Sequence, residues 1–225
     1  MSKNISIKTV IIIFLVILFL IILITPKDII KKPRYIGAVV AKVFVSGQKL
    51  NYTYNASLTS GFNLVSLPCT VKNNSLENIL SSIASELVSV HTYDTTNLTD
   101  RWKSYNPSLP SWAISDLSTA SVGSGYWINM NSEKNLVMNC AIEKPNSISL
   151  YTGWNLVAYR SNESKNTSLA LSTIDGKYSI IYGFNATSQN YRIYEPNLGN
   201  NTLNILEPDK GYWINATSSV SWFIT

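Results

Sequence analysis

The sequence predicts a mainly β, β-rich α+β protein in which an N-terminal transmembrane helix precedes two tandem small β modules, each with one short helix. Three observations predict this fold class. An apolar run lies near the N-terminus. Short segments rich in aromatic and β-branched residues follow, separated by Asn, Ser and Gly turns. Several sequence landmarks then occur twice in the same order, which indicates an internal duplication.

The apolar run without a charge covers residues 9–24 and has basic residues on both sides. As a helix it spans roughly 24 Å, slightly less than the hydrocarbon core of a bilayer. The residues after it lack the small-x-small pattern of a signal peptidase site. We therefore expect residues 1–34 to form a signal anchor and a basic stalk. A cleaved signal peptide, and with it a secreted protein, is the alternative.

The formal net charge of +5 comes from the membrane flank alone. Residues 1–34 contain six Lys and Arg and one Asp, whereas residues 35–225 contain twelve Lys and Arg and twelve Asp and Glu. The part after the anchor is therefore neutral and has no basic footprint for nucleic acid. We expect the membrane as a partner, through residues 9–24, and no nucleic acid.

The orientation of the anchor has arguments on both sides. The excess of basic residues after the apolar run favours a cytoplasmic C-terminal part. The uncharged Asn, Ser, Thr and Tyr composition and the two cysteines favour export, as do sequons at about twice the chance frequency. We expect a single-pass cell-membrane glycoprotein with residues 35–225 outside. The candidate glycosylation sites are Asn51, Asn55, Asn73, Asn97, Asn162, Asn166, Asn185, Asn200 and Asn215.

Residues 35–56 lie before the duplicated part and alternate as a β-strand or hairpin. Such a segment pairs with module 1, pairs with another subunit, or remains a spacer. An unpaired strand leaves its N–H and C=O groups open to pairing. We favour pairing of residues 36–45 with module 1 of the same chain.

Module 1 covers residues 57–142. Ser75 is suited to cap a short helix with one apolar stripe, because Leu76, Ile79, Leu80, Ile83 and Leu87 follow at helical spacing. Alternation and turn residues predict the strands around this helix. These strands are Phe62 to Leu67, Leu87 to Tyr93, Arg101 to Tyr105, Gly125 to Met130 and Leu136 to Ala141.

Module 2 covers residues 149–225 and repeats this order. Gly-Phe-Asn-Leu-Val at Gly61 returns as Gly-Trp-Asn-Leu-Val at Gly153, and Gly-Tyr-Trp-Ile-Asn at Gly125 returns at Gly211. We match Ser168-Leu169 to Ser75-Leu76. The second copy is six residues shorter between these landmarks, and we place most of the loss in its helix, which Gly176 would end early.

The two cysteines, Cys69 and Cys140, both lie in module 1. Their positions suit a disulfide between its first and last strands, and two buried free thiols are the alternative. A disulfide over this loop contributes about 4 kcal/mol in the chain-entropy account. Two such distant cysteines with a single histidine do not make a metal-ligand set, so we expect no metal.

The sequence offers little for catalysis. His91 is the only histidine, and its counterpart in module 2 is Tyr182. Asp94 and Asp100 lie in a predicted turn whose counterpart carries no acid. No nucleophile elbow or phosphate-binding loop is present. We therefore expect no enzyme, no catalytic residue and no cofactor.

Five aromatic residues allow two interpretations: Trp102, Tyr105, Trp112, Tyr191 and Tyr194. They stack on sugar rings at a surface, or they bury one ring each in a small core. Because they recur in both copies, we favour the core. Tyr126 and Trp127, with Tyr212 and Trp213, are predicted to be structural, following a glycine in a tight turn.

Together these landmarks resemble a repeat module of exported, surface-layer-associated proteins of archaea and some bacteria. The resemblance covers residues 57–142 and 149–225. It implies a non-enzymatic β-rich surface module without catalytic or binding residues. We therefore expect a structural, adhesive or envelope-assembly role at the cell surface, with other envelope proteins, the protein itself or glycans as partners. The alternative function is a carbohydrate-binding module held at the surface.

Overall fold

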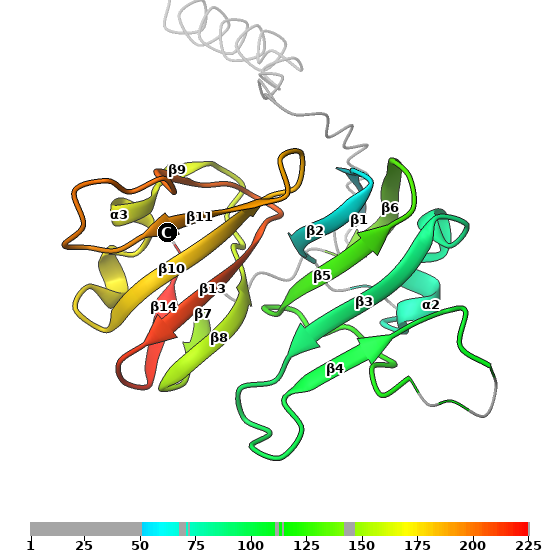
Figure 1. Ribbon diagram of the computed structural model, residues 1–225, viewed down its shortest axis with the longest axis horizontal. Helices are drawn as coiled ribbons and strands as arrows, with labels where there is room; N and C mark the ends of the chain where they lie inside the picture. The colour runs from blue at the N-terminus through cyan, green and yellow to red at the C-terminus, as the bar shows by residue number, and fades with distance from the viewer. Residues whose placement is uncertain are drawn as a thin grey trace, which may run out of the picture. The chain divides into compact units, whose positions relative to one another are not determined.

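The computed structural model describes residues 51–67, 71, 73–110, 113, 115–141 and 147–224. All of these belong to one compact unit, Val39–Thr225. They form antiparallel sheets with two short helices, which confirms the mainly β fold (Figure 1). No described helix combines the length and the apolar character needed to cross a bilayer, and the predicted membrane segment lies outside the described residues.

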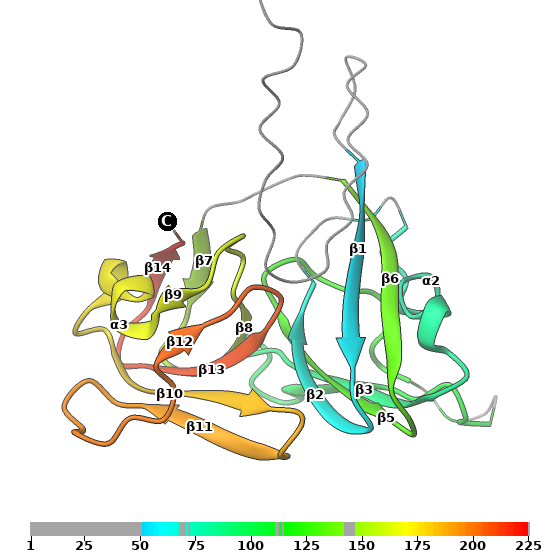
Figure 2. The same ribbon diagram turned by 90° about the horizontal axis from the view of Figure 1, so that it is seen from above.

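The first repeat contains a four-stranded sheet in the order β2-β5-β3-β4 and a two-stranded sheet of β1 and β6. Figure 2 shows β1 beside β6 with α2 close to them. The bounds are β1 Asn51–Leu58, β2 Gly61–Ser66, α2 Leu76–Ile79, β3 Leu87–Tyr93, β4 Trp102–Tyr105, β5 Gly125–Met130 and β6 Lys134–Ala141.

The second repeat has the same strand order, β8-β13-β10-β11, with β7 and β14 as its two-stranded sheet. A short additional pair joins β9 to β12. The bounds are β7 Ser147–Leu150, β8 Gly153–Ala158, β9 Lys165–Asn166, α3 Thr167–Ala170, β10 Tyr178–Asn185, β11 Asn190–Tyr194, β12 Ile205–Leu206, β13 Gly211–Ala216 and β14 Val220–Phe223.

Strand β1 begins before the predicted start of module 1. It pairs with β6 from Asn51↔Ala141 to Leu58↔Lys134, and β7 pairs with β14 in the corresponding way. The boundary drawn between residues 56 and 57 therefore falls inside a strand that has a counterpart in the second repeat. Residues 36–45, for which we favour pairing with the same chain, lie outside the described residues.

Each repeat has its own apolar core. In the first repeat, residues of β1 and β6 pack with α2 and the central strands, and Tyr54, Ile83 and Leu136 are all almost fully buried. In the second repeat, Trp222 of β14 is 0 % exposed and donates its indole N–H to Ala170 O at 2.9 Å. Both cores pack a two-stranded sheet and a short helix against the larger sheet.

The first helix begins as predicted, and the second does not. Ser75 is the N-cap of α2 and its Oγ accepts a hydrogen bond from Asn78 N. Asn166 is the N-cap of α3, and its Oδ1 accepts from Ser168 N at 3.1 Å. The predicted match of Ser168 to Ser75 is therefore wrong by two residues.

Burial explains this shift. Thr167 is fully buried and donates its hydroxyl to Leu203 O at 2.8 Å, whereas Leu169 is 63 % exposed. Both helices have four residues, so the predicted shortening of the second helix is also wrong. Two of the six missing residues are instead lost in the connection at residues 185–190, whose counterpart is residues 94–101. Three more are lost between Tyr194 and Gly211, relative to the stretch from Tyr105 to Gly125.

Candidate functional site

The two Gly-x-Asn-Leu-Val motifs each contain a buried asparagine, whose side chain forms hydrogen bonds with the main chain of the turn before it. Asn155 Oδ1 accepts from Tyr151 N at 2.9 Å, and its Nδ2 donates to Tyr151 O and to Gly153 O. Asn63 makes the same bonds in the first repeat. Gly153 has φ +95, a backbone conformation that favours glycine. The asparagine side chain of the motif therefore stabilises the turn by hydrogen bonds to its main chain.

The tyrosine of each Gly-Tyr-Trp-Ile-Asn motif is structural, as predicted. Tyr126 Oη accepts from Ser121 N at 2.7 Å and donates to Ser121 O, and Tyr212 Oη accepts from Glu207 N at 2.8 Å. Both rings are 2 % exposed. Burial raises the pKa of both hydroxyls, which stay protonated.

The glycine of the same motif is required for a different reason than the predicted tight turn. A Cβ at Gly211 would lie 2.9 Å from Val65 O of the other repeat, and a Cβ at Gly125 would lie 3.1 Å from Val157 O. Neither glycine has a positive φ. The two glycines therefore admit the close approach of the opposite repeat.

This contact between the repeats is self-complementary. Ser66 N donates to Asp209 O at 2.9 Å, and the corresponding Ala158 N donates to Gly123 O at the same distance. Isolated bridges join Val65 to Lys210 and Ser124 to Val157 in the same way. Each contact thus has a counterpart with the two repeats exchanged, as in an isologous dimer.

Aromatic rings extend this symmetry. Trp127 contacts Phe184 and Tyr191 of the second repeat, with centroid distances of 4.8 and 6.0 Å. Trp213 contacts Tyr93 and Trp102 of the first repeat, at 5.0 and 5.7 Å. Leu64 and Leu156 pack in one small apolar cluster with four of these rings. The motif residues therefore hold the two repeats together.

A groove of about 510 Å³ opens at one end of this aromatic contact, and we call it the aromatic groove. Two of its rings, Trp102 and Tyr191, are 52 % and 56 % exposed. Trp154 lies 5.6 Å from Tyr182, with their planes 34° apart. The groove is lined by Tyr93, Trp102, Trp154, Tyr182, Tyr191 and Trp213.

The structure divides four of the five predicted stacking residues into two groups. Trp102 and Tyr191 line the aromatic groove, in line with the sugar-stacking interpretation. Tyr105 and Tyr194 pack against the cores of their own repeats, in line with the core interpretation. Trp112 lies outside the described residues. Sequence reasoning missed Trp154 and Tyr182 as groove residues, although their replacement by Phe62 and His91 in the first repeat marks them as different.

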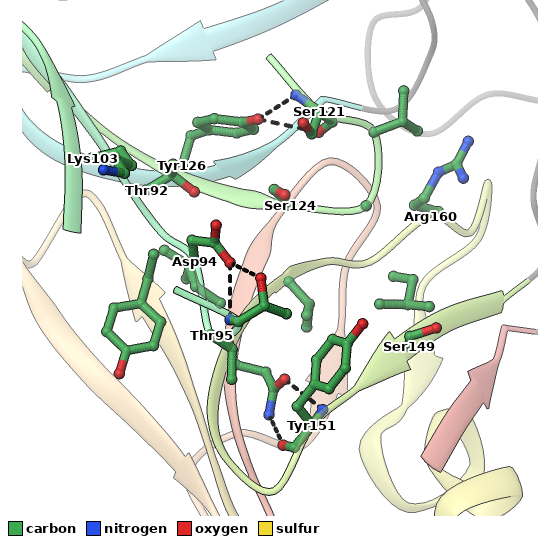
Figure 3. Close-up of a pocket in the computed structure, with 18 of the residues that line it drawn as sticks. Thr92, Asp94, Thr95, Lys103, Ser121, Ser124, Tyr126, Ser149, Tyr151 and Arg160 are labelled. Carbon is green, nitrogen blue, oxygen red and sulfur yellow. Dashed lines mark hydrogen bonds between the residues drawn. The ribbon is translucent and has the colours of Figure 1, made fainter. Parts of the chain in front are cut away.

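Figure 3 shows a second, hydroxyl-rich pocket, which has a volume of about 500 Å³. It shares Tyr93 with the aromatic groove. Serine and threonine side chains make up much of its lining. The hydrogen bond from Thr96 Oγ1 to the Asp94 carboxylate, at 2.6 Å, lowers the pKa of Asp94. Lys103 is bonded to Asp100 and lies 3.4 Å from Asp116 Oδ2, and the bond to Asp100 raises its pKa. The pocket therefore presents hydroxyls together with the charged side chains Asp94, Lys103 and Arg160.

The other predicted positions are distributed as follows. His91 Nε2 lies 2.9 Å from Ser89 Oγ. Within the described residues, no three His, Cys, Asp or Glu side chains form a group able to hold a metal ion. Cys140 is 1 % exposed and disulfide-bonded. Its predicted partner Cys69 lies outside the described residues, so the pairing stays a prediction.

The sequon asparagines with described side chains all lie at the surface, at least in part. Several use their side chains locally: Asn97 and Asn185 accept main-chain hydrogen bonds in turns, and Asn166 caps α3. Asn51 is in β1, and its side chain is outside the described part of the chain. The exposed sequon asparagines are Asn55, Asn73, Asn162, Asn166 and Asn200.

Comparison of the chain with protein-family models, curated proteins and solved structures finds no match. The resemblance to a surface-layer-associated repeat module therefore stays a prediction. The aromatic groove and the hydroxyl-rich pocket are the features from which a function has to be inferred.

Proposed function

We propose that this protein is a non-enzymatic, membrane-anchored cell-surface protein that adheres to carbohydrate through the aromatic groove. The observation that carries the proposal is a groove that, among the described residues, is lined by six aromatic side chains and by no charged one. Its rim rings Trp102 and Tyr191 are more than half exposed, which is costly unless a partner covers them. The anchor and the outward orientation are inferred from the sequence.

Sugar rings fit this lining better than the other common ligands. The C–H groups on the flat face of a hexose pack against tryptophan and tyrosine rings, and the hydroxyls at its edge remain free for hydrogen bonds. The adjoining pocket offers hydroxyl groups of the matching kind. An organic cation is less suitable, because the Arg101 guanidinium lies 5.9 Å from the centre of the Tyr93 ring.

The ring angles indicate how much of a glycan is held. A flat polysaccharide surface needs several coplanar rings. Here the exposed Trp102 meets Trp213 at 61° and Tyr93 at 74°. Such inclined rings form a concave site, which suits one or two sugar units of a soluble or surface-linked chain.

Binding of the full-length chain, purified in detergent, to an array of oligosaccharides tests this function. We expect Trp102→Ala combined with Tyr191→Ala to lower the affinity for a bound glycan about tenfold or more. Phe223→Ala is the matched control, since Phe223 is equally exposed at 53 % and does not line the groove. A full-length protein that binds no glycan would refute the proposal.

Protease treatment of intact cells tests the surface location separately. We expect the part after residue 34 to be degraded from outside, because the sequons and the composition indicate export. Complete protection until the cells are lysed would place this part in the cytoplasm and contradict the proposed location.

A further inference from the structure

Two large apolar side chains of the second repeat lie at the surface next to Asn166, and we call them the apolar pair. Asn166 ends strand β9 and pairs with Ile205 of β12, which is 51 % exposed. Leu169 follows Asn166 by three residues, a spacing that places side chains on one face of a helical turn, and it is 63 % exposed. Figure 2 shows β9 and α3 near β12. The exposed Asn166 side chain therefore has two apolar neighbours that face water.

The first repeat has polar side chains at the same places. Ser75, the N-cap of α2, is the counterpart of Asn166, the N-cap of α3. It forms an isolated bridge with Thr119, in the place of the pairing with β12. Asn78 follows it by three residues, and both Thr119 and Asn78 are exposed. The fold that the repeats share therefore does not require the apolar pair, which is present only in the repeat that has the asparagine.

Asn166 is also the acceptor of a sequon, Asn166-Thr167-Ser168, whereas its counterpart is a serine. Asn166 Oδ1 accepts from Ser168 N at 3.1 Å and from Ser168 Oγ at 2.7 Å. No described residue accepts a hydrogen bond from Asn166 Nδ2. A sugar on Nδ2 replaces one of its two hydrogens and leaves Oδ1 as an acceptor. The asparagine can therefore be modified while it still caps α3.

We propose that Asn166 carries an N-linked glycan whose first sugar packs against the apolar pair, an inference that rests on the proposed surface location. Directly opposite residues of an antiparallel pair have Cβ atoms about 4.5–5.5 Å apart, so a sugar ring on Asn166 Nδ2 lies over its neighbour Ile205. The C–H groups of the ring cover methyl groups that otherwise face water. The hydroxyl groups of the sugar remain in solvent.

The modification is a glycosyl transfer from a lipid-linked sugar phosphate. A bond forms between Asn166 Nδ2 and the anomeric carbon of the sugar, while the bond from that carbon to the phosphate oxygen breaks. The lipid phosphate leaves with the electron pair of the broken bond, and a base of the transferase takes one proton from Nδ2. Asn166 and Ser168 are both exposed, so a transferase on the outer side of the membrane reaches the sequon in the folded protein.

Glycopeptide mass spectrometry of the full-length protein from its native membrane tests the modification. We expect the peptide with Asn166 to carry a glycan. Ser168→Thr should retain this glycan because the sequon is kept, and Ser168→Ala should lose it. An unmodified Asn166 in protein that protease degrades on intact cells would overturn this inference and leave the proposed location standing. Full protection from protease until the cells are lysed would overturn both.

Thermal unfolding of the glycosylated protein tests the packing. Ser168→Ala should lower the melting temperature by about 2–4 °C relative to Ser168→Thr. Leu169→Asn combined with Ile205→Thr gives Asn166 the neighbours found in the first repeat, and in that background the same comparison should differ by less than about 1 °C. Protein made in a host without the transferase is the control for the lost Ser168 hydroxyl, and there the two Ser168 variants should melt within about 1 °C of each other. An equal fall with and without the apolar pair would overturn the packing.

Discussion

Replacing Gly211 by alanine tests whether the two repeats are held together by close main-chain approach. The added Cβ would lie 2.9 Å from Val65 O and 3.0 Å from Leu64 Cδ1. Val65 O belongs to strand β2, so it cannot move without disturbing the hydrogen bonds of that sheet. The clash therefore has to be relieved by separating the repeats.

The magnitude follows from two opposing effects. Overpacking at a contact of this kind costs about 1–3 kcal/mol. The lower chain entropy of alanine in the unfolded state offsets about 0.4–1 kcal/mol. We expect Gly211→Ala to lower the free energy of unfolding by about 1–2 kcal/mol. For a unit of this size the melting temperature should fall by about 2–8 °C.

Denaturant unfolding, followed by tryptophan fluorescence, measures this change. Gly199→Ala is the control, because a Cβ at Gly199 meets nothing within 4 Å and its φ is not positive. That variant should be neutral or slightly stabilised. Gly125→Ala should behave like Gly211→Ala, since its Cβ meets Leu156 Cδ1 at 3.0 Å. If Gly211→Ala is as stable as Gly199→Ala, the close-approach argument is wrong.

Three further predictions concern the stability and the covalent structure of the chain. Asn155→Ala should lower the free energy of unfolding by about 2–3 kcal/mol in a denaturation assay, because buried main-chain groups lose their partners; a change below about 0.5 kcal/mol would contradict the bracing role. Burial raises the pKa of Asp209 to about 6. Folding therefore favours its protonated form, so this contribution to stability is complete below pH 4 and is lost as the pH rises through 6. Asp209→Asn should remove the change in stability between about pH 4 and pH 6. An unchanged pH–stability curve would show that Asp209 does not cause it. Non-reducing peptide mapping should find Cys69 linked to Cys140, whereas two alkylatable thiols would contradict the pairing.

Local patterns predict several of the strands closely. Strand β3 spans Leu87–Tyr93, as expected from its alternation, and β5 spans Gly125–Met130. The return strand was placed one residue too early, at Arg101 instead of Trp102. These elements follow from residues that are neighbours in the chain, so a short window of sequence contains the information.

The second helix shows where a local pattern is ambiguous. Asn166 and Ser168 are both good N-cap residues. The choice is made by burial, because Thr167 packs into the core and Leu169 does not. Sequence alone favours the leucine for the buried position, and the hydrogen bond from Thr167 to Leu203 O reverses that preference.

The contact between the repeats could not be predicted from short windows. Gly211 requires glycine because of Val65, and Phe62 is bound by Gln189, a residue 127 positions away. Such contacts depend on how two finished sheets meet. The internal duplication does contain a usable signal. The Gly-x-Asn-Leu-Val motif is present in both copies and forms the edge strands β2 and β8, which lie at the contact between the repeats.

The exchange symmetry also bears on the proposed ligand site. A self-complementary contact requires similar residues at both ends, and the shared glycines, leucines and tryptophans meet that requirement. Positions that differ between the repeats are not under this requirement for similar residues. Tyr182 replaces His91 and Trp154 replaces Phe62, and the Gln189 carboxamide has no equivalent at Gly153. These differences gather at one end of the aromatic contact, and that end is the aromatic groove. Making the two ends alike should therefore abolish binding while the repeats remain docked.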